Sequence, residues 1–216
     1  MDATKASRAE ARRQLYEALA SLFQYPAPGY AQRAADAASL DGMAPAAATK
    51  LAEFARQIAA LPLEALEELY TQTFDLNPVG TPDVGWHLFG EQYERGEFLV
   101  KMRGLLRRHG LRESAELPDH LAHVLALVGR MKHEEADEFA GACLFPALDK
   151  MRAGVSGARQ PAAGDNPFAL LLEAVGGVLE SHFTRPEPAP TPLRVLPGRS
   201  GPPGRGQGGI CDDHAV

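Results

Sequence analysis

The sequence has little that could hold a metal cluster or brace a small secreted fold. It contains only two cysteines, Cys143 and Cys211. Two cysteines cannot form a metal tetrad or a disulfide framework, so zinc-cluster and disulfide-rich classes are excluded. We interpret Cys143 as a small buried hydrophobic residue and place Cys211 in a C-terminal tail.

Long apolar runs are also absent. No stretch approaches the roughly eighteen apolar residues that a membrane-spanning helix needs. Residues 1–14 lack the apolar segment and the small-residue cleavage site of a secretory signal. We therefore expect a cytoplasmic protein that does not insert into membranes.

Positive charge is in deficit, with a formal net charge of -6 and a pI near 5.7. Such a chain has no general attraction for the phosphates of nucleic acids or for anionic lipid. We expect no nucleic-acid partner, and an acidic surface favours a basic partner instead.

Apolar residues recur with helical spacing over residues 1–185, and no segment alternates as a strand does. The 216 residues, 45% of them hydrophobic, are enough for one core. We predict an all-α, single-domain helical bundle. The expected helices are one carrying Leu15, Leu19, Leu22 and Phe23; one carrying Leu51, Phe54, Ala55 and Ile58; one from Pro62 to Phe74; a long one from about Trp86 to His109, stopped by Gly110; one from Pro118 to Met131; one from about Glu134 to Met151, interrupted by Pro146; and one opened by Asn166 and Pro167.

Two segments are expected to lack regular structure. Residues 154–164 are mostly small, which predicts a linker. Two subunits could exchange helices across such a linker, so we expect a monomer or a domain-swapped dimer. Proline and glycine make up about half of residues 186–209, so 186–216 is predicted to be a disordered tail beside a 1–185 domain. Its Gly204–Gly209 pattern resembles a dinucleotide loop but has no preceding strand or following helix.

No catalytic or metal site is predicted, although a metal-dependent hydrolase stays open as an alternative. No Glu-x-x-His or His-Glu-x-x-His pair occurs. His120 and His123 share a helix face but have no evident third ligand. Ser114 near Asp119 and His120 is the one hydrolase-like combination, without a nucleophile elbow around the serine. We also expect no bound cofactor.

The run from Glu116 to Leu121 is the most informative short motif. Proline suits the first position of a helix, which places Pro118 there and Asp119 favourably against the helix dipole. We expect Asp119 near a helix surface, where it and a switchable His120 imidazole could bind a cationic peptide.

Three aromatic residues have two interpretations each. Tyr70 and Phe74 lie four positions apart on one helix face, which suits either a core or a groove. Trp86, the only tryptophan, follows a Pro/Gly-rich loop and could anchor a peptide or close the bundle.

Four blocks together resemble the nitrate reductase delta-subunit chaperones, often called NarJ, within the TorD/DmsD group. Their order and spacing match over roughly residues 67–131. The blocks are Tyr70–Leu76, His87–Glu91, Arg95–Gly96 and Glu116–Leu121.

The resemblance implies a TorD-like helical chaperone without enzymatic activity. Its partner would be the catalytic subunit of a molybdenum-cofactor oxidoreductase, whose N-terminal signal or remnant segment it holds for cofactor insertion before export or membrane attachment. A general helical adaptor is the alternative. Residues 77–85 depart from the nitrate-reductase pattern, so a selenate, chlorate or dimethyl sulfide oxidoreductase is an equally open client. The implied and adjoining peptide-binding residues are Tyr70, Phe74, Trp86, His87, Glu91, Gly96, Glu116, Pro118, Asp119 and His120.

Overall fold

The computed structural model describes residues 2–157 and 166–187, and all regular structure within these ranges is helical. The prediction of an all-α, single-domain bundle is confirmed. Most of the predicted linker, the predicted tail from residue 188 and its glycine pattern lie outside the described residues. None of the described helices combines the length and the apolar character needed to cross a membrane.

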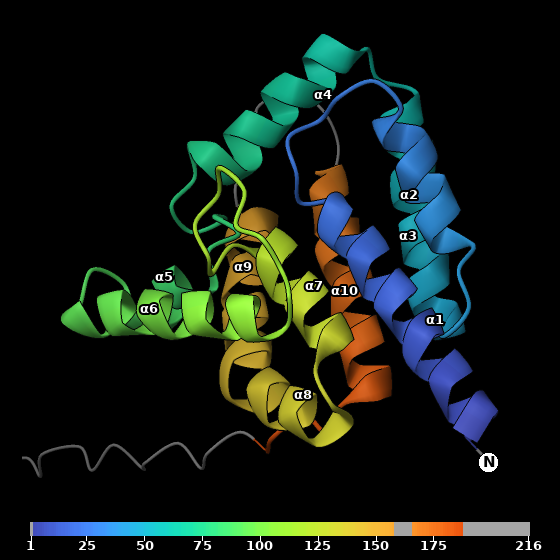
Figure 1. Cartoon of the computed structure of the whole chain (residues 1–216). Coiled ribbons are helices and arrows are strands. Elements are labelled where there is room, and N and C mark those ends of the chain that lie inside the picture. The colour runs from blue at the N-terminus through green and yellow to red at the C-terminus, as the bar shows by residue number, and fades with distance from the viewer. Residues whose placement is uncertain (1, 158–165, 188–216) are drawn as a thin grey trace, which may run out of the picture. The chain divides into compact units, whose positions relative to one another are not determined.

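Figure 1 shows the arrangement of the described helices. They are α1 (Asp2–Ser21), α2 (Tyr30–Ala38), α3 (Pro45–Ala59), α4 (Leu63–Tyr70), the π-helical turn η1 (Thr71–Asp75), α5 (Val84–Phe89), α6 (Tyr93–Arg108), α7 (Leu121–Arg130), α8 (His133–Phe139), the π-helical turn η2 (Ala140–Leu144), α9 (Phe145–Gly157) and α10 (Pro167–His182).

The core is built around α10, which packs against both α3 and α9 (Figure 1). The α1 helix packs along α7, and α5 packs on α9. The apolar positions predicted to face the core are buried on each of these helices. On α1 and α3 they are Leu15, Leu19, Leu51, Phe54, Ala55 and Ile58, and on α10 they are Phe168, Leu171, Leu172, Val175 and Leu179. Cys143 is only partly buried against this core.

An aromatic cluster joins α4 and η1 to α10. The Tyr70 ring lies 5.0 Å from Phe74 and 5.7 Å from Phe168, measured between ring centroids. The Tyr70 hydroxyl donates a hydrogen bond to the Phe23 carbonyl at 2.8 Å. Edge-to-face packing of this kind and a satisfied hydroxyl are typical of a core. Tyr70 is therefore a core residue.

The prediction of one long helix from Trp86 to His109 is wrong, because a helix ends at Gly90. This residue has φ 60° and ψ -132°, and its N–H closes α5 on the Trp86 carbonyl at 2.8 Å. A separate helix, α6, then begins at Tyr93. The predicted stop at Gly110 is confirmed, since φ there is 68° and Leu111 donates back to Leu106 at 2.8 Å.

The prediction that Pro118 opens a helix is also wrong, because α7 begins at Leu121. The segment before it pairs with the segment before α5 in an isolated antiparallel bridge between Asp83 and His120. Two backbone bonds of 3.0 Å fix it, from Val84 to Asp119 and from Leu121 to Pro82. Residues held in this extended pairing cannot also take helical dihedrals.

The linker prediction fails at its first residues, because α9 continues to Gly157. Gly154 lies inside α9, where a Cβ would overlap the Val79 carbonyl. The glycine lets the chain after η1 lie directly on the helix. The interruption predicted at Pro146 is confirmed as η2, which ends just before it. The alanine-rich α2 was not predicted at all.

Candidate functional site

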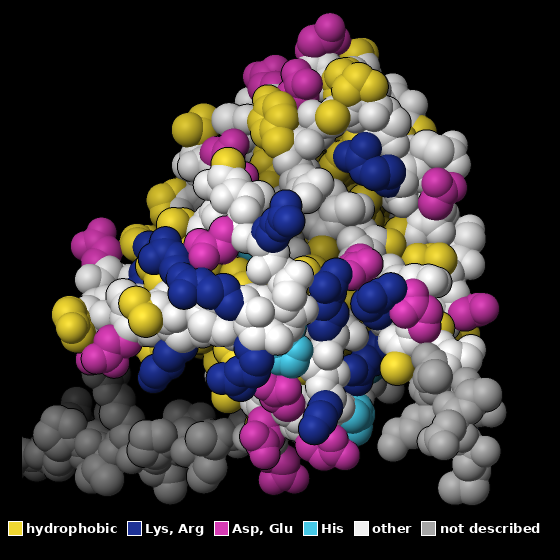
Figure 2. Space-filling model, viewed as in Figure 1, with side chains coloured by type: hydrophobic (Ala, Val, Ile, Leu, Met, Phe, Trp, Pro, Cys, Tyr) yellow, Lys and Arg dark blue, Asp and Glu magenta, His cyan; other side chains and the backbone are white. Residues whose placement is uncertain are grey.

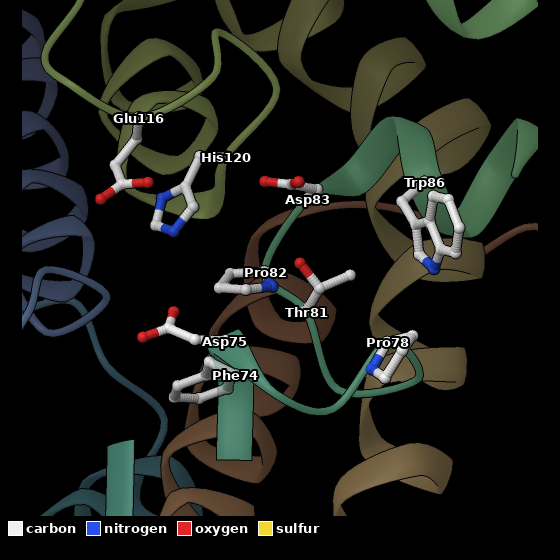
Figure 3. Close-up of a pocket in the computed structure, with 9 residues that line it drawn as sticks. All are labelled: Phe74, Asp75, Pro78, Thr81, Pro82, Asp83, Trp86, Glu116 and His120. Atoms are coloured by element: carbon white, nitrogen blue, oxygen red, sulfur yellow. The ribbon is translucent and has the colours of Figure 1, made fainter. Parts of the chain in front are cut away.

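A pocket of about 380 Å³ lies where three segments meet (Figure 3). It is lined from the end of η1, the chain leading into α5, and the loop before α7. Four predicted site residues line it, namely Phe74, Trp86, Glu116 and His120. Five more residues complete it, namely Asp75, Pro78, Thr81, Pro82 and Asp83.

The five residues that sequence reasoning missed come from one short stretch, 75–83. The sequence contains a signal that could have pointed to them. Two aspartates, Asp75 and Asp83, stand at the ends of a Pro/Gly-rich connection between two of the family-like blocks. What brings Asp83 to His120 is the antiparallel bridge between them. No local pattern reports such a pairing across the fold.

Asp119 does not line the pocket, but its side chain connects two of the segments that do. Its side chain is 0% exposed, contrary to the expectation that it lies near a helix surface. Oδ2 accepts a hydrogen bond of 2.9 Å from the Gly85 N–H in the first turn of α5. Burial raises the pKa of Asp119, and the Gly85 bond and the charge of Arg95 oppose this rise. Oδ1 is buried without a partner among the described residues.

His120 offers a hydrogen-bond donor to the pocket. It is the N-cap of α7, and Nδ1 accepts from the Ala122 N–H at 3.2 Å. Burial lowers the pKa of His120 to about 4, so the ring is neutral at physiological pH and the proton stays on Nε2. Nε2 has no hydrogen bond to another described residue, and the ring extends into the pocket (Figure 3). At neutral pH the ring therefore presents an N–H donor to the pocket.

Three carboxylates line the same pocket as this donor. Asp75 and Glu116 are exposed, while Asp83 is partly buried and pairs with Arg95 at 3.1 Å. Burial raises the pKa of Asp83 to about 6; the neighbouring charge of Asp119 adds to the rise, and Arg95 opposes it. The pocket is therefore acidic and incompletely neutralised, which favours a cationic ligand.

Arg95 shows how a guanidinium fits beside this pocket. Its Cζ lies 5.3 Å from the centre of the Trp86 ring, while Nη2 bonds to Asp83. Stacking on an aromatic face and pairing with a carboxylate are the two interactions that guanidinium groups prefer. Trp86 and Asp83 thus already bind a guanidinium within the chain.

Exposed apolar side chains follow or adjoin the pocket residues along the chain. Leu76 is 73% exposed, Val79 58% and Leu117 41%. They stand next to Asp75, Pro78 and Glu116 in the sequence. Exposed large apolar residues grouped with charged ones are typical of an interaction site.

The remaining predicted site residues lie outside the pocket. Pro118 is buried in the turn before α7, and His87 is buried with Nε2 at 2.7 Å from the Thr81 carbonyl, so both hold the surrounding loops. Glu91 is exposed in the turn after Gly90. Gly96 lies on an exposed face of α6, where a Cβ would meet no atom within 4 Å.

Ser114, Asp119 and His120, the catalytic combination considered from the sequence, each accept a hydrogen bond from a backbone N–H group and make none with one another among the described residues. His123 uses both ring nitrogens on backbone groups, with Nδ1 at 2.9 Å from the Leu117 carbonyl and Nε2 at 3.0 Å from the Ser114 N–H. The Ser114 hydroxyl accepts from the Glu116 N–H at 3.2 Å. Within residues 2–157 and 166–187, no group of three His, Cys, Asp or Glu side chains is placed to hold a metal.

The pocket thus combines carboxylates, one aromatic ring system and prolines on an all-helical fold. Residues 37–158, more than half of the chain, match the nitrate reductase delta subunit family, and the chain belongs to that family. Members of this family are chaperones for molybdoenzyme assembly and not enzymes. All pocket residues fall within the matched range. No curated protein matches the chain.

Proposed function

We propose that this chaperone binds the N-terminal segment of the catalytic subunit of a molybdenum-containing oxidoreductase in the pocket between η1, α5 and the loop before α7. Binding takes place in the cytoplasm and holds the subunit until its cofactor is inserted, before export or membrane attachment. The observation that carries the proposal is the incompletely neutralised acidic pocket lined by Trp86, within the range matched to the family.

The pocket offers each group that such a segment needs. A twin-arginine export signal presents two guanidiniums followed by an apolar stretch. Asp83 and Glu116 accept charge-assisted hydrogen bonds from the guanidiniums, and the Trp86 face stacks on one of them, as it does on Arg95. The apolar stretch continues over Leu76 and Val79.

His120 supplies a hydrogen bond to the backbone of the peptide. Its Nε2–H points into the pocket and donates to a peptide carbonyl, which every residue of the ligand has. Apolar burial provides most of the affinity, while the carboxylates and His120 set the orientation. The chain forms no covalent bond with its client.

The segment that leads into α5 determines which molybdoenzyme is recognised. Residues 78–86 contribute five of the nine residues that line the pocket. The same stretch includes most of the sequence that departs from the nitrate-reductase pattern. The oxidoreductases that act on nitrate, selenate, chlorate or dimethyl sulfide therefore remain the candidate clients, and exchange of this segment between relatives should exchange the client.

The test is a titration of the full chain with the N-terminal peptide of the molybdoenzyme catalytic subunit encoded beside it. Trp86 is the only tryptophan, so its fluorescence reports the pocket directly, and calorimetry gives the affinity. We expect micromolar or tighter binding that weakens with salt.

Two exposed carboxylates serve as a matched pair of variants. Glu116→Gln removes a pocket charge and should weaken binding about two- to fivefold, as expected for a solvent-accessible ion pair. Glu97→Gln removes an exposed charge on α6, outside the pocket, and should leave the affinity unchanged. Equal effects of both variants, or no binding by the wild type, would refute the proposed site.

A further inference from the structure

A second cleft, of about 1140 Å³, lies between α1 and the junction of α7 and α8. It shares no lining residue with the acidic pocket. Lys and Arg side chains gather in this region, as Figure 2 shows between α1 and the α7–α8 end of the bundle. The cations that line the cleft are Arg8, Arg12, Arg13, Arg130 and Lys132.

The cleft is basic on a chain whose net charge is -6. Only two carboxylates, Glu10 and Glu134, stand among its lining residues. Arg13 pairs with Glu10 at 2.8 Å, and Arg130 pairs with Glu17 at 2.7 Å. Arg8, Arg12 and Lys132 have no carboxylate partner within the described part of the chain. A local excess of positive charge therefore remains.

Arg12 is the residue that points to a ligand. Its guanidinium donates to the Met131 carbonyl, and its Nε is buried with no partner among the described residues. A half-buried cation without a counter-ion is costly, since it has lost water and gained only one neutral acceptor. A carboxylate bound beside the accessible part of this side chain would supply the missing negative charge.

The walls of the cleft favour an extended ligand over a small anion. Arg8 and Arg12 are four residues apart on one face of α1, while Arg130 and Lys132 stand on the opposite side at the end of α7. The close approach of the two helices forms the floor, because a Cβ at Gly129 would lie 2.8 Å from the Tyr16 Cβ. A row of carboxylates can meet cations on both walls at once, whereas a phosphate ion is a single compact charged group.

We propose that this cleft binds an acidic segment of a polypeptide. The chain then has two docking surfaces of opposite charge, one for a cationic segment and one for an anionic segment. A partner that carries both segments can bind at both surfaces. Binding of one segment raises the local concentration of the other near its own surface, so the overall affinity exceeds that of either segment alone.

The experiment titrates the full chain with a labelled oligo-aspartate peptide, a shorter version of it, and inorganic phosphate. The double variant Arg8→Glu with Lys132→Glu changes two exposed cleft residues. The control, Lys101→Glu with Arg107→Glu, makes the same change of net charge on two exposed α6 residues outside the cleft.

We expect the cleft variant to raise the Kd for the longer peptide at least about tenfold, and the control to change it by less than about threefold. The longer peptide should bind more tightly than the shorter one, and phosphate should compete only weakly. Equal loss in both variants, no binding, or competition by phosphate at the concentration of the peptide overturns the proposal. Binding of a cationic peptide in the pocket should be unchanged by the cleft variant, so the two proposals fail separately.

Discussion

The Asp119 carboxylate accepts a hydrogen bond from the backbone N–H of Gly85 at 2.9 Å, across 34 positions of sequence. This bond ties the loop before α7 to the first turn of α5, which carries Trp86. A Cβ at Gly85 would lie 2.7 Å from Asp119 Oδ2 and 2.8 Å from the Phe98 ring, so only glycine fits. The pocket depends on Asp119 without being lined by it.

Asp119→Ala should therefore lower the stability of the fold. The change leaves the Gly85 N–H buried without an acceptor, which costs about 1–3 kcal/mol. Asp119→Asn keeps an acceptor oxygen and removes a buried charge, so its melting temperature should stay near that of the wild type. Thermal unfolding measures both. An alanine variant that melts like the wild type but binds peptide poorly would instead place Asp119 in contact with the ligand.

Binding of a cationic peptide should strengthen as the pH rises through about 6. The pKa of Asp83 is about 6, so this carboxylate is half protonated there and can pair with a cation only above it. The charged groups that influence it are Asp119, Arg95 and Glu116. His120, with a pKa of about 4, contributes no change in this range. The measurement is calorimetry between pH 5 and 8, expected to show a step that Asp83→Asn removes.

The free energy of unfolding should change with pH in the opposite direction to the peptide affinity, because of the same Asp83 carboxyl group. Because the folded-state pKa of Asp83 is raised from 3.8 to about 6, the protonated form is favoured by folding. The stability that it contributes is fully present below pH 3.8 and is lost as the pH rises through about 6. Denaturant unfolding of the wild type and Asp83→Asn should diverge over this interval. Parallel curves would show that Asp83 titrates normally.

Gly154→Ala should destabilise the fold and weaken peptide binding together. Its Cβ would overlap the Val79 carbonyl, so the segment that leads into the pocket must move, at a cost of about 1–3 kcal/mol. Gly96→Ala is the control, because that helical glycine meets no atom within 4 Å and should gain about 0.5–1 kcal/mol. Denaturant unfolding and peptide titration of both variants test this, and a neutral Gly154→Ala would mean that the segment does not rest on α9.

Tyr70 variants should affect stability and leave the pocket chemistry intact. Tyr70→Ala removes a buried ring from the aromatic cluster and should cost about 3–5 kcal/mol. Tyr70→Phe removes only the hydrogen bond to the Phe23 carbonyl, worth about 0.5–1.5 kcal/mol. Chemical denaturation measures these costs. Peptide affinity of Tyr70→Phe should equal that of the wild type, and a clear loss would return Tyr70 to the binding site.

Helix positions were predictable where the apolar spacing agrees with residues that favour the start or the end of a helix. On α10, Asn166 caps the helix by accepting from Phe168 at 3.0 Å, Pro167 follows it, and the apolar positions are all buried. The end at Gly110 was predictable for the same reason, because left-handed dihedrals favour glycine. The α2 helix was missed although its buried residues Tyr30, Ala34 and Ala37 recur at helical spacing, because two of the three are alanines.

The breaks within helices were not predictable from local signals. Gly90 stands in a stretch with continuous helical spacing, yet the chain turns there so that α5 can pack on α9. Pro118 has the chemistry of a helix start, but its neighbours Asp119 and His120 pair with residues 82–84 instead. In both places tertiary contacts outweigh a local preference that amounts to about 1 kcal/mol per residue.

The sequence by itself determined the helical class, the family and the residue types of the site, because helical periods and short motifs are local properties of a chain. Which of those residues meet in one pocket was decided by the tertiary structure alone. It placed Tyr70 in the core and Asp119 beneath the pocket, and it brought Asp83 to Glu116 and His120. Such placements depend on backbone hydrogen bonds and packing between distant segments, which no spacing along the chain encodes.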